Sequence, residues 1–205
     1  RMKDLISNQL VKYLEARGVK HVFGLCGHTN IAVLAALSKS RKIKFVNTRH
    51  EQIAAHAADG YARATKKTSV VLSHLSPGLT NAATGVANLH ADASQSEIYR
   101  PFVKRVWRVD SPHLFPEIIE KAFALAESGR PGPVLVDVPM DVFSKEIDVA
   151  LWKQVQLNAR SVRKPSLDDE TAGKIVRQLL AAKTPVLYVG GGVLLADAAE
   201  EMREF

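Results

Sequence analysis

TRHEQIAAHAADGYAR, residues 48–63, is the most informative stretch of the chain. It places one carboxylate, Glu51, at the start of a helix whose next turns are too rich in alanine to form an ordinary surface. A carboxyl group between a strand end and such a helix can be shielded from water, which suits it to proton exchange with a bound ligand. The spacing of Thr48 and Glu51 also fits a capping box, in which the glutamate only caps backbone amides. The stretch alone leaves both interpretations open.

Length and composition describe an ordinary globular protein. The chain has 205 residues, of which 46% are hydrophobic, so it can bury a full core in one or two domains. No apolar run is long enough to span a bilayer, and the first residues lack the apolar core of a signal peptide. The single cysteine, Cys26, excludes an internal disulfide and favours a cytoplasmic location. We expect Cys26 to be a small, buried hydrophobic residue.

The formal net charge of +7 raises the possibility of nucleic-acid binding. However, the basic residues are scattered, with short clusters only at residues 41–42, 66–67 and 160–164. No zinc-ligand spacing or aromatic–basic RNA signature accompanies them. Anionic small molecules or a partner surface explain the charge as well, and we expect no nucleic-acid partner.

Helical patterns and short apolar runs alternate along the chain. The expected strands are residues 22–25, 43–46, 69–72 and 134–138, and the expected helices are 5–14, 31–38, 51–64, 79–88 and 114–128. Strands that are apolar throughout and alternate with helices indicate the α/β class, with a parallel sheet and helices on both faces.

The pattern divides the chain into two domains. We predict a first domain over residues 1–143 and a linker over 144–166, where Lys, Arg, Asn, Ser and Pro accumulate. Residues 167–205 predict the start of a second α/β domain, with a helix at 168–182, a strand at 186–189 and three glycines at 190–192. One strand and two helices cannot bury a core, so we expect a fragment of a longer polypeptide.

Five motifs follow one another in the first domain. They are VFG-x-x-G at 22–27, HE-x-x-A at 50–54 with GYAR at 60–63, SPG-x-x-N at 76–81, GPV at 132–134 and DVP at 137–139. In this order and spacing they resemble the N-terminal, pyrimidine-binding domain of thiamine-diphosphate-dependent enzymes. The subgroup is that of acetolactate synthase, pyruvate and benzoylformate decarboxylases and benzaldehyde lyase. The resemblance covers nearly all of residues 1–143 and implies an acetolactate-synthase-like enzyme that makes or breaks a C–C bond adjacent to a carbonyl.

The resemblance assigns roles to single residues. A glutamate at the position of Glu51 hydrogen-bonds the aminopyrimidine ring of the cofactor and starts the proton relay that activates it. Gly24 and Gly27 would let the backbone approach this ring closely. Pro77-Gly78 would shape the turn after the third strand, and Asn81 would hold the local backbone. Without the resemblance, these glycines would be interpreted as ordinary α/β turns.

Two histidines, His28 and His74, follow predicted strands, at the sheet edge where open α/β folds bind ligands. The resemblance to benzoylformate decarboxylase puts His74 where that enzyme has an active-site histidine, and His28 at a substrate-facing position. An imidazole can give and accept a proton near neutral pH, so the resemblance implies that both take part in catalysis. Without it, each would be interpreted as a polar turn residue.

The resemblance also implies partners. The substrate would be a 2-oxo acid or a related diketone or 2-hydroxy ketone, and the protein would be a homodimer or a dimer of dimers. The Gly-Asp-Gly…Asn motif that holds diphosphate and Mg²⁺ in the family is absent, so we assign no metal ligand and expect the Mg²⁺ ligands outside this segment. Gly190–Gly192 could face FAD or ADP, but the spacing is not that of a dinucleotide fingerprint, and a tight turn is favoured.

Two features depart from the family. Between Asn88 and Leu89 the family carries a strand and a loop, about thirty residues in all, that this sequence lacks. Because a core strand is hard to lose, we expect the protein to carry this segment although the sequence omits it. Acetolactate synthases usually carry Pro-Gly-Gly where this chain has Cys26-Gly27-His28, which argues against acetolactate formation itself. The alternatives are a C–C hydrolase or lyase, a non-catalytic α/β binding domain, and a protein that binds NAD or FAD at residues 190–192.

Overall fold

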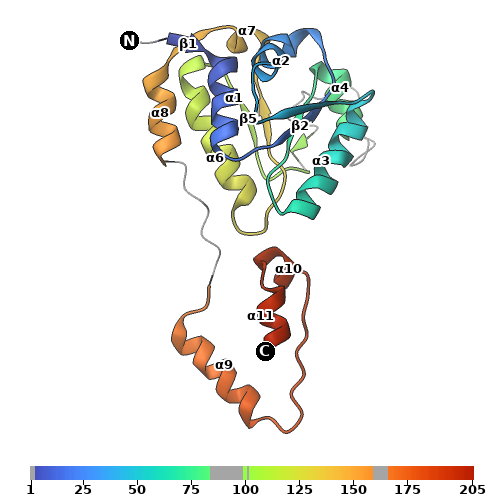
Figure 1. The fold of residues 1–205 in the computed structure, drawn as a ribbon, viewed down its shortest axis with the longest axis vertical. Coiled ribbons are helices and arrows are strands. Elements are labelled where there is room, and N and C mark those ends of the chain that lie inside the picture. The colour runs from blue at the N-terminus through green and yellow to red at the C-terminus, as the bar shows by residue number, and fades with distance from the viewer. Residues whose placement is uncertain (1–2, 84–98, 101, 159–165) are drawn as a thin grey trace. The chain divides into compact units, whose positions relative to one another are not determined.

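The computed structural model describes residues 3–83, 99–100, 102–158 and 166–205. It divides into two compact units, Arg1–Val162 and Arg163–Phe205 (Figure 1). Within the described residues, no helix has both the length and the apolar character needed to cross a membrane.

The first unit alternates strands with helices. Its strands are β1 (Lys3–Leu5), β2 (His21–Gly24), β3 (Lys44–Asn47), β4 (Val70–Leu72), β5 (Val106–Arg108), β6 (Leu135–Asp137) and β7 (Glu146–Asp148). Its α-helices are α1 (Ile6–Ala16), α2 (Ile31–Leu37), α3 (Glu51–Thr65), α4 (Leu75–Ala83), α6 (Phe115–Glu127), α7 (Met140–Phe143) and α8 (Val149–Asn158). Its described residues also form two short 3₁₀ turns, η1 (His28–Asn30) and η2 (Pro112–Leu114).

The strands form two parallel sheets and one antiparallel pair. β2 lies between β3 and β4, and β5 pairs with β6, in both cases in parallel. The predicted α/β class with a parallel sheet is therefore confirmed. The antiparallel pair of β1 and β7 was not predicted, because three-residue strands are too short to show a period of two.

Adjacent residues of β2 face opposite sides of the sheet, as the pleat requires. Val22 belongs to the larger apolar core, which also contains buried residues of α1, α2, α6 and α8. Phe23 belongs to a second, smaller core with Ala54 and Ala58 of α3. Helices therefore cover both faces of this sheet (Figure 1), and two alanines of the predicted helix at residues 51–64, Ala54 and Ala58, are buried against it.

The composition predicted a linker over residues 144–166, but β7 and α8 are part of the first unit. The Trp152 side chain is 0% exposed, and its ring centroid lies 5.8 Å from that of Tyr13 and 5.7 Å from that of Phe115. The lysine, glutamines and asparagine elsewhere on α8 made the segment resemble a linker in the sequence, although Trp152 is fully buried. The boundaries of the two domains stay a prediction.

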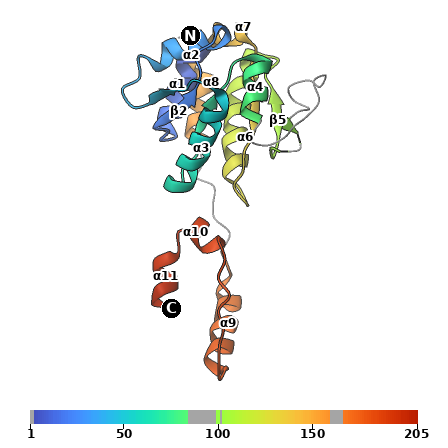
Figure 2. The ribbon, with the colours of Figure 1, turned by 90° about the vertical axis from the view of Figure 1, so that its right-hand side faces the viewer.

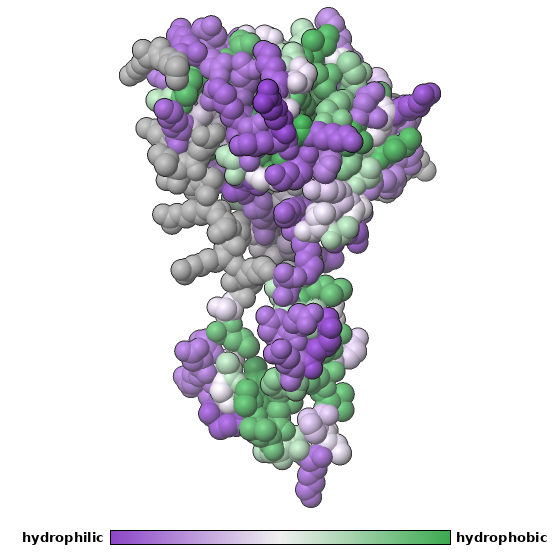
Figure 3. Space-filling model, viewed as in Figure 1, coloured by the Kyte–Doolittle hydropathy of each residue, from purple (hydrophilic) through white to green (hydrophobic). Residues whose placement is uncertain are grey.

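The second unit consists of α9 (Asp169–Ala181), α10 (Gly192–Ala196) and α11 (Ala199–Glu204). The expected strand at residues 186–189 is wrong: Val186 and Tyr188 are 86% and 101% exposed, and the segment is extended without a partner strand in the described part of this unit. A strand forms only where a neighbour accepts its backbone hydrogen bonds. Apolar side chains consequently lie on the surface of this unit (Figure 3).

Candidate active site

Three parallel strands end together in the first unit. Gly24 of β2 lies opposite Asn47 of β3 and Leu72 of β4 in the hydrogen-bonded register. The loops that follow these strands carry most of the predicted site residues. Ligands of open α/β sheets bind at this carboxyl edge, so the topology brings the predicted residues to the right side of the sheet.

Glu51 is the first residue of α3 and is only 5% exposed. The N-cap residue is His50, whose Nδ1 accepts a hydrogen bond from the backbone N–H of Gln52 at 3.3 Å. The Thr48 hydroxyl instead lies 3.2 Å and 3.0 Å from the carbonyl oxygens of Gly24 and His50, to which it donates. A capping box needs the glutamate at the third helical position and a hydroxyl that accepts from its amide. The capping-box interpretation of Glu51 is therefore wrong.

The Glu51 carboxylate is held from the neighbouring helix α4, which lies beside α3 (Figure 2). Nδ2 of Asn81 donates to Oε2 of Glu51 at 3.2 Å. A Cβ atom on Gly78 would lie 2.6 Å from Oε1 of Glu51 and 3.0 Å from Oγ of Ser73, so no larger residue fits there without displacing one of them. The Ser73 Oγ is buried and has no hydrogen-bond partner among the described residues. Glu51, Gly78, Asn81 and Ser73 thus form one polar cluster.

Pro77 and Gly78 were expected to shape a turn before the helix, and this is wrong. Helix α4 begins at Leu75, so both residues lie in its first turn. Proline is compatible with that position because the first amides of a helix have no intrahelical acceptor. The predicted helix at residues 79–88 therefore starts four residues earlier, and its residues after Ala83 lie outside the described part of the chain.

His74 lies between β4 and α4, and its ring packs against the loop after β2. A Cβ atom on Gly27 would lie 2.1 Å from Cγ of His74, so the imidazole occupies the space of a residue-27 side chain. The hydroxyl Oγ1 of Thr29 lies 2.7 Å from Nδ1 of the ring, and the backbone N–H of Thr29 donates to the same nitrogen at 3.4 Å. The structure therefore brings Gly27 and His74 together, as predicted site residues, and adds Thr29.

Asn30 fixes the shape of this loop. It is 2% exposed, its Oδ1 accepts from the N–H of Gly27 at 3.0 Å, and its Nδ2 donates to the carbonyl of Leu25 at 3.0 Å. Neither Thr29 nor Asn30 was singled out from the sequence, although asparagine side chains often hydrogen-bond nearby backbone groups in turns. His28 begins η1, is exposed, and makes no side-chain hydrogen bond to a described residue.

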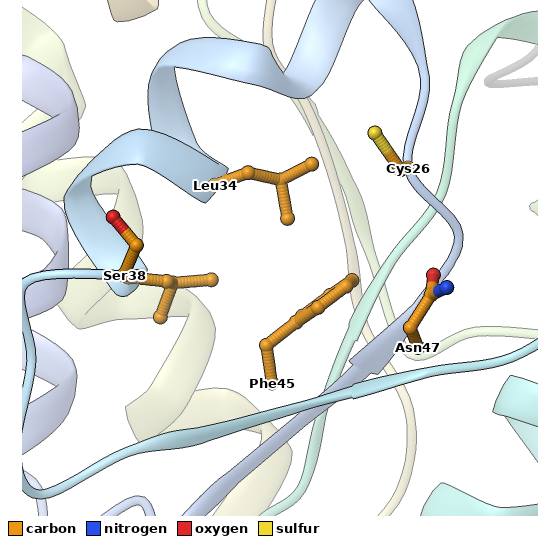
Figure 4. Close-up of a pocket in the computed structure, with 6 residues that line it drawn as sticks. Cys26, Leu34, Ser38, Phe45 and Asn47 are labelled. Atoms are coloured by element: carbon orange, nitrogen blue, oxygen red, sulfur yellow. The ribbon is translucent and has the colours of Figure 1, made fainter.

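Gly24 and Cys26 occupy other surroundings. A Cβ atom on Gly24 would lie 2.3 Å from the carbonyl oxygen of Leu72, so this glycine allows β2 to approach β4. Cys26 is exposed, so its expected burial is wrong. It lines an open, mainly apolar pocket of about 360 Å³ (Figure 4). The other lining residues are Leu34, Leu37, Ser38, Phe45 and Asn47.

Metal-ligating residues do not gather in this site. Within the described residues, no group of three or more His, Cys, Asp and Glu side chains is arranged to hold a metal ion. A Cβ atom added to any of the glycines at residues 190–192 would meet nothing within 4 Å, so they show no close approach of the kind that a dinucleotide turn uses.

The sequence is similar to known proteins over nearly its whole length. A family model described as the N-terminal TPP (thiamine pyrophosphate, another name for thiamine diphosphate) binding domain of thiamine pyrophosphate enzymes matches residues 6–95. The chain is 34% identical to an acetolactate synthase large subunit of Buchnera aphidicola, with 97% of the chain and 39% of the relative covered. It is 38% identical to the subunit of Corynebacterium glutamicum, with 96% and 35% covered.

The fold is also that of a solved structure, a thiamine diphosphate-dependent 4-hydroxybenzoylformate decarboxylase of Rhodococcus jostii. The TM-score is 0.81 at 23% identity, with 97% of the chain and 41% of that structure covered. The alignment with the Buchnera subunit runs over 224 residues although this chain has 205, so that relative carries residues that this chain lacks. The expected gap between Asn88 and Leu89 lies outside the described residues and stays a prediction.

The chain spans about two fifths of the length of the curated relatives it matches. The five motifs, the parallel sheet and the matched family model agree on one group of proteins. Residues 6–95 therefore match the N-terminal cofactor-binding domain of the thiamine-pyrophosphate-dependent enzymes, and the chain as a whole is similar to members of that group.

Proposed function

We propose that this chain is part of an enzyme that makes or breaks a C–C bond next to the carbonyl group of a 2-oxo acid, in the manner of acetolactate synthase. The observation that carries the proposal is the Glu51 carboxylate, 5% exposed at the start of α3 and hydrogen-bonded by Asn81. The identity of 34–38% to acetolactate synthase large subunits supports the substrate class.

The cluster around Glu51 fits the aminopyrimidine end of thiamine diphosphate. A buried carboxyl group can exchange a hydrogen bond and a proton with a ring nitrogen. Gly78 keeps the space beside the carboxylate free of side-chain atoms, and the buried Ser73 hydroxyl has no hydrogen-bond partner among the described residues. When bound, thiamine diphosphate supplies a carbanion and an electron sink for C–C bond chemistry.

In this proposal each site residue has its own role. Glu51 holds and returns the proton at the pyrimidine nitrogen, while Asn81 keeps one carboxylate oxygen in place. His74, and with it His28, gives or accepts protons at the substrate. Gly24 and Gly27 let the backbone of the loop after β2 come close to the ring, and Pro77 lies in the first turn of the helix that carries Gly78 and Asn81.

A second candidate is a lyase or hydrolase that acts on a diketone or a 2-hydroxy ketone. His74 is compatible with it, because its ring is held against Gly27 at the same sheet edge as Glu51 and could give a proton to the carbon atom that is released when a C–C bond breaks. The replacement of Pro-Gly-Gly by Cys26-Gly27-His28 points the same way.

Calorimetry and product analysis on the full-length protein test the proposal. We expect magnesium-dependent binding of thiamine diphosphate, and turnover of pyruvate or another 2-oxo acid with release of carbon dioxide. Turnover of a cyclic diketone without carbon dioxide would support the second candidate. No binding of thiamine diphosphate by the full-length protein would leave the non-catalytic binding domain as the better description.

The assembly is part of the same proposal. We place the cofactor between two subunits of a cytoplasmic homodimer or dimer of dimers, with the Mg²⁺ ligands outside this segment. Residues 1–205 would then supply only the pyrimidine half of the site. We expect the isolated segment to bind thiamine diphosphate weakly, and the full-length protein to sediment as a dimer or tetramer. Tight, magnesium-dependent binding by the isolated segment contradicts this arrangement.

A further inference from the structure

We infer that Thr29 is a positioning residue that fixes which nitrogen of His74 carries the proton. The inference rests on the proposed function, in which His74 exchanges protons with the substrate. It concerns a contact between two loops, η1 after β2 and the segment between β4 and α4, that the sequence motifs did not predict.

The hydrogen bonds to Nδ1 decide the tautomer. A backbone N–H can only donate, so the contact from the Thr29 amide at 3.4 Å requires a lone pair on Nδ1 of His74. The Thr29 hydroxyl lies 2.7 Å from the same nitrogen, and with the lone pair on Nδ1 it donates to that nitrogen as well. In the neutral ring the proton then resides on Nε2. Nε2 makes no hydrogen bond to any residue that the structure describes, so the proton is on the ring nitrogen left available to a ligand.

The loop is built to hold Thr29 in this position. Asn30 is buried and ties its side chain to the amide of Gly27 and to the carbonyl of Leu25, and its own amide donates to the carbonyl of Gly27 at 3.2 Å. The imidazole packs directly against the backbone of Gly27, where any side chain would overlap the ring. The ring is therefore fixed in position by Gly27 and in protonation by Thr29.

Thr29→Val removes the hydroxyl and keeps the shape of the side chain, and Thr29→Ser keeps the hydroxyl. Thr65→Val is the matched control, because the Thr65 hydroxyl bonds a backbone carbonyl at the end of α3. Losing one hydrogen bond should reduce turnover of the full-length enzyme about five- to tenfold, with unchanged affinity for thiamine diphosphate. Thr29→Ser should restore turnover, and Thr65→Val should not reduce it.

A double variant tests whether Thr29 acts through His74. We expect Thr29→Val combined with His74→Ala to lose no more turnover than His74→Ala alone, because a positioning residue has nothing left to position. Losses that multiply in the double variant, or a Thr29→Val enzyme as active as the wild type, would overturn the inference.

The tautomer can also be observed without cofactor or turnover. In the full-length apoprotein labelled with ¹⁵N-histidine, the His74 ring, assigned by its loss in His74→Ala, should show a proton on Nε2 only. In Thr29→Val only the longer contact from the backbone amide, 3.4 Å, remains to favour this tautomer, so we expect a mixture of both. An unchanged ring spectrum overturns the inference whatever the enzyme does. Conversely, if Glu51→Gln keeps full turnover, the proposed function fails while this measurement still decides the role of Thr29.

Discussion

Asn81 and Glu51 connect two helices through one hydrogen bond: Nδ2 of Asn81 lies 3.2 Å from Oε2 of Glu51, at the first turn of α3. Gly78 precedes Asn81 by three residues on α4, so the two share a helix face. Glycine leaves room for one carboxylate oxygen, and asparagine binds the other. The spacing of glycine and asparagine in the SPG-x-x-N motif thus follows from the need to seat a buried carboxylate.

Glu51→Gln tests the central assignment. The amide has nearly the shape of the carboxylate and can still accept from Asn81, so we expect a folded protein with an unchanged thermal midpoint. It cannot deliver a proton to a ring nitrogen, so turnover should fall by at least about a hundredfold. Each tenfold loss corresponds to about 1.4 kcal/mol of barrier. Steady-state kinetics at saturating thiamine diphosphate measure this.

Glu117→Gln provides the control for Glu51→Gln. Glu117 is also an acidic residue in the first turn of a helix, but its side chain is 59% exposed and forms an ion pair with Lys121. We expect its substitution to change neither turnover nor stability, because an exposed ion pair contributes little. Near-normal turnover in Glu51→Gln would mean that the buried carboxylate has no catalytic role.

Gly78→Ala should separate activity from stability. The added Cβ would lie 2.6 Å from Oε1 of Glu51, and the carboxylate, as the end of a flexible side chain, can move away. We expect the free energy of unfolding to change by less than about 1 kcal/mol, since alanine favours the helix. A displaced carboxylate should cost about a hundredfold in turnover, the usual effect of an error of about 1 Å in a catalytic group.

Gly60→Ala is the matched substitution on α3. A Cβ atom there meets nothing within 4 Å, and its φ lies outside the left-handed region. It should stabilise the protein by about 0.5–1 kcal/mol and leave turnover unchanged. If both alanine variants keep full turnover, the close packing of Gly78 against Glu51 has no functional consequence.

The sheet edge that carries the site was predictable because its strands and helices have clear periods. Apolar runs such as Val22–Leu25 and the alanines of residues 51–64 marked β2 and α3, and parallel strands must end at one edge. The contacts made by Thr29 and Asn81 were not predictable. They join loops or helices far apart in sequence, 45 residues for Thr29 to His74 and 30 for Asn81 to Glu51. Only the folded register brings them together.

Other elements failed for different reasons. Helix α8 was predicted as a linker because one anchor, Trp152, supplies its deepest burial. The strand expected at residues 186–189 has the right composition but no neighbour in the described part of its unit. The composition of a segment indicates which side chains it could bury. Whether it forms a strand or a packed helix also depends on a neighbouring surface against which those side chains can pack.

Asp4 should make the first unit sensitive to acid. Burial raises its pKa, but hydrogen bonds from Asn8, Lys12 and Gln9 outweigh this and hold the pKa at about 2. Because the folded pKa lies below the ordinary value of 3.8, the stabilisation is complete above about pH 5 and is lost as the pH falls from about 4 to 2. With partial solvent exposure, we expect about 1 kcal/mol.

The comparison for Asp4 is the pH dependence of Asp4→Asn. The variant should unfold at a lower temperature than the wild type at pH 7, and the difference should shrink as the pH falls below about 4. A difference in thermal midpoint that stays constant from pH 7 to pH 2.5 would show that Asp4 acts through its shape and not through its charge.

His74 and His28 should control the fate of the reaction intermediate and not the binding of the cofactor. Both follow strands that end at the edge shared with Glu51, and the His74 ring is held by Gly27 and Thr29, whereas His28 is exposed. We expect His74→Ala to keep its affinity for thiamine diphosphate and to lose turnover by about a hundredfold. His28→Ala should change the product ratio, because an exposed imidazole on a short turn can reach only the outer part of a substrate.

The control is His113→Ala, since His113 is an exposed histidine of η2, and this variant should resemble the wild type. If turnover and products are unchanged in both variants at saturating cofactor, the two histidines are polar turn residues.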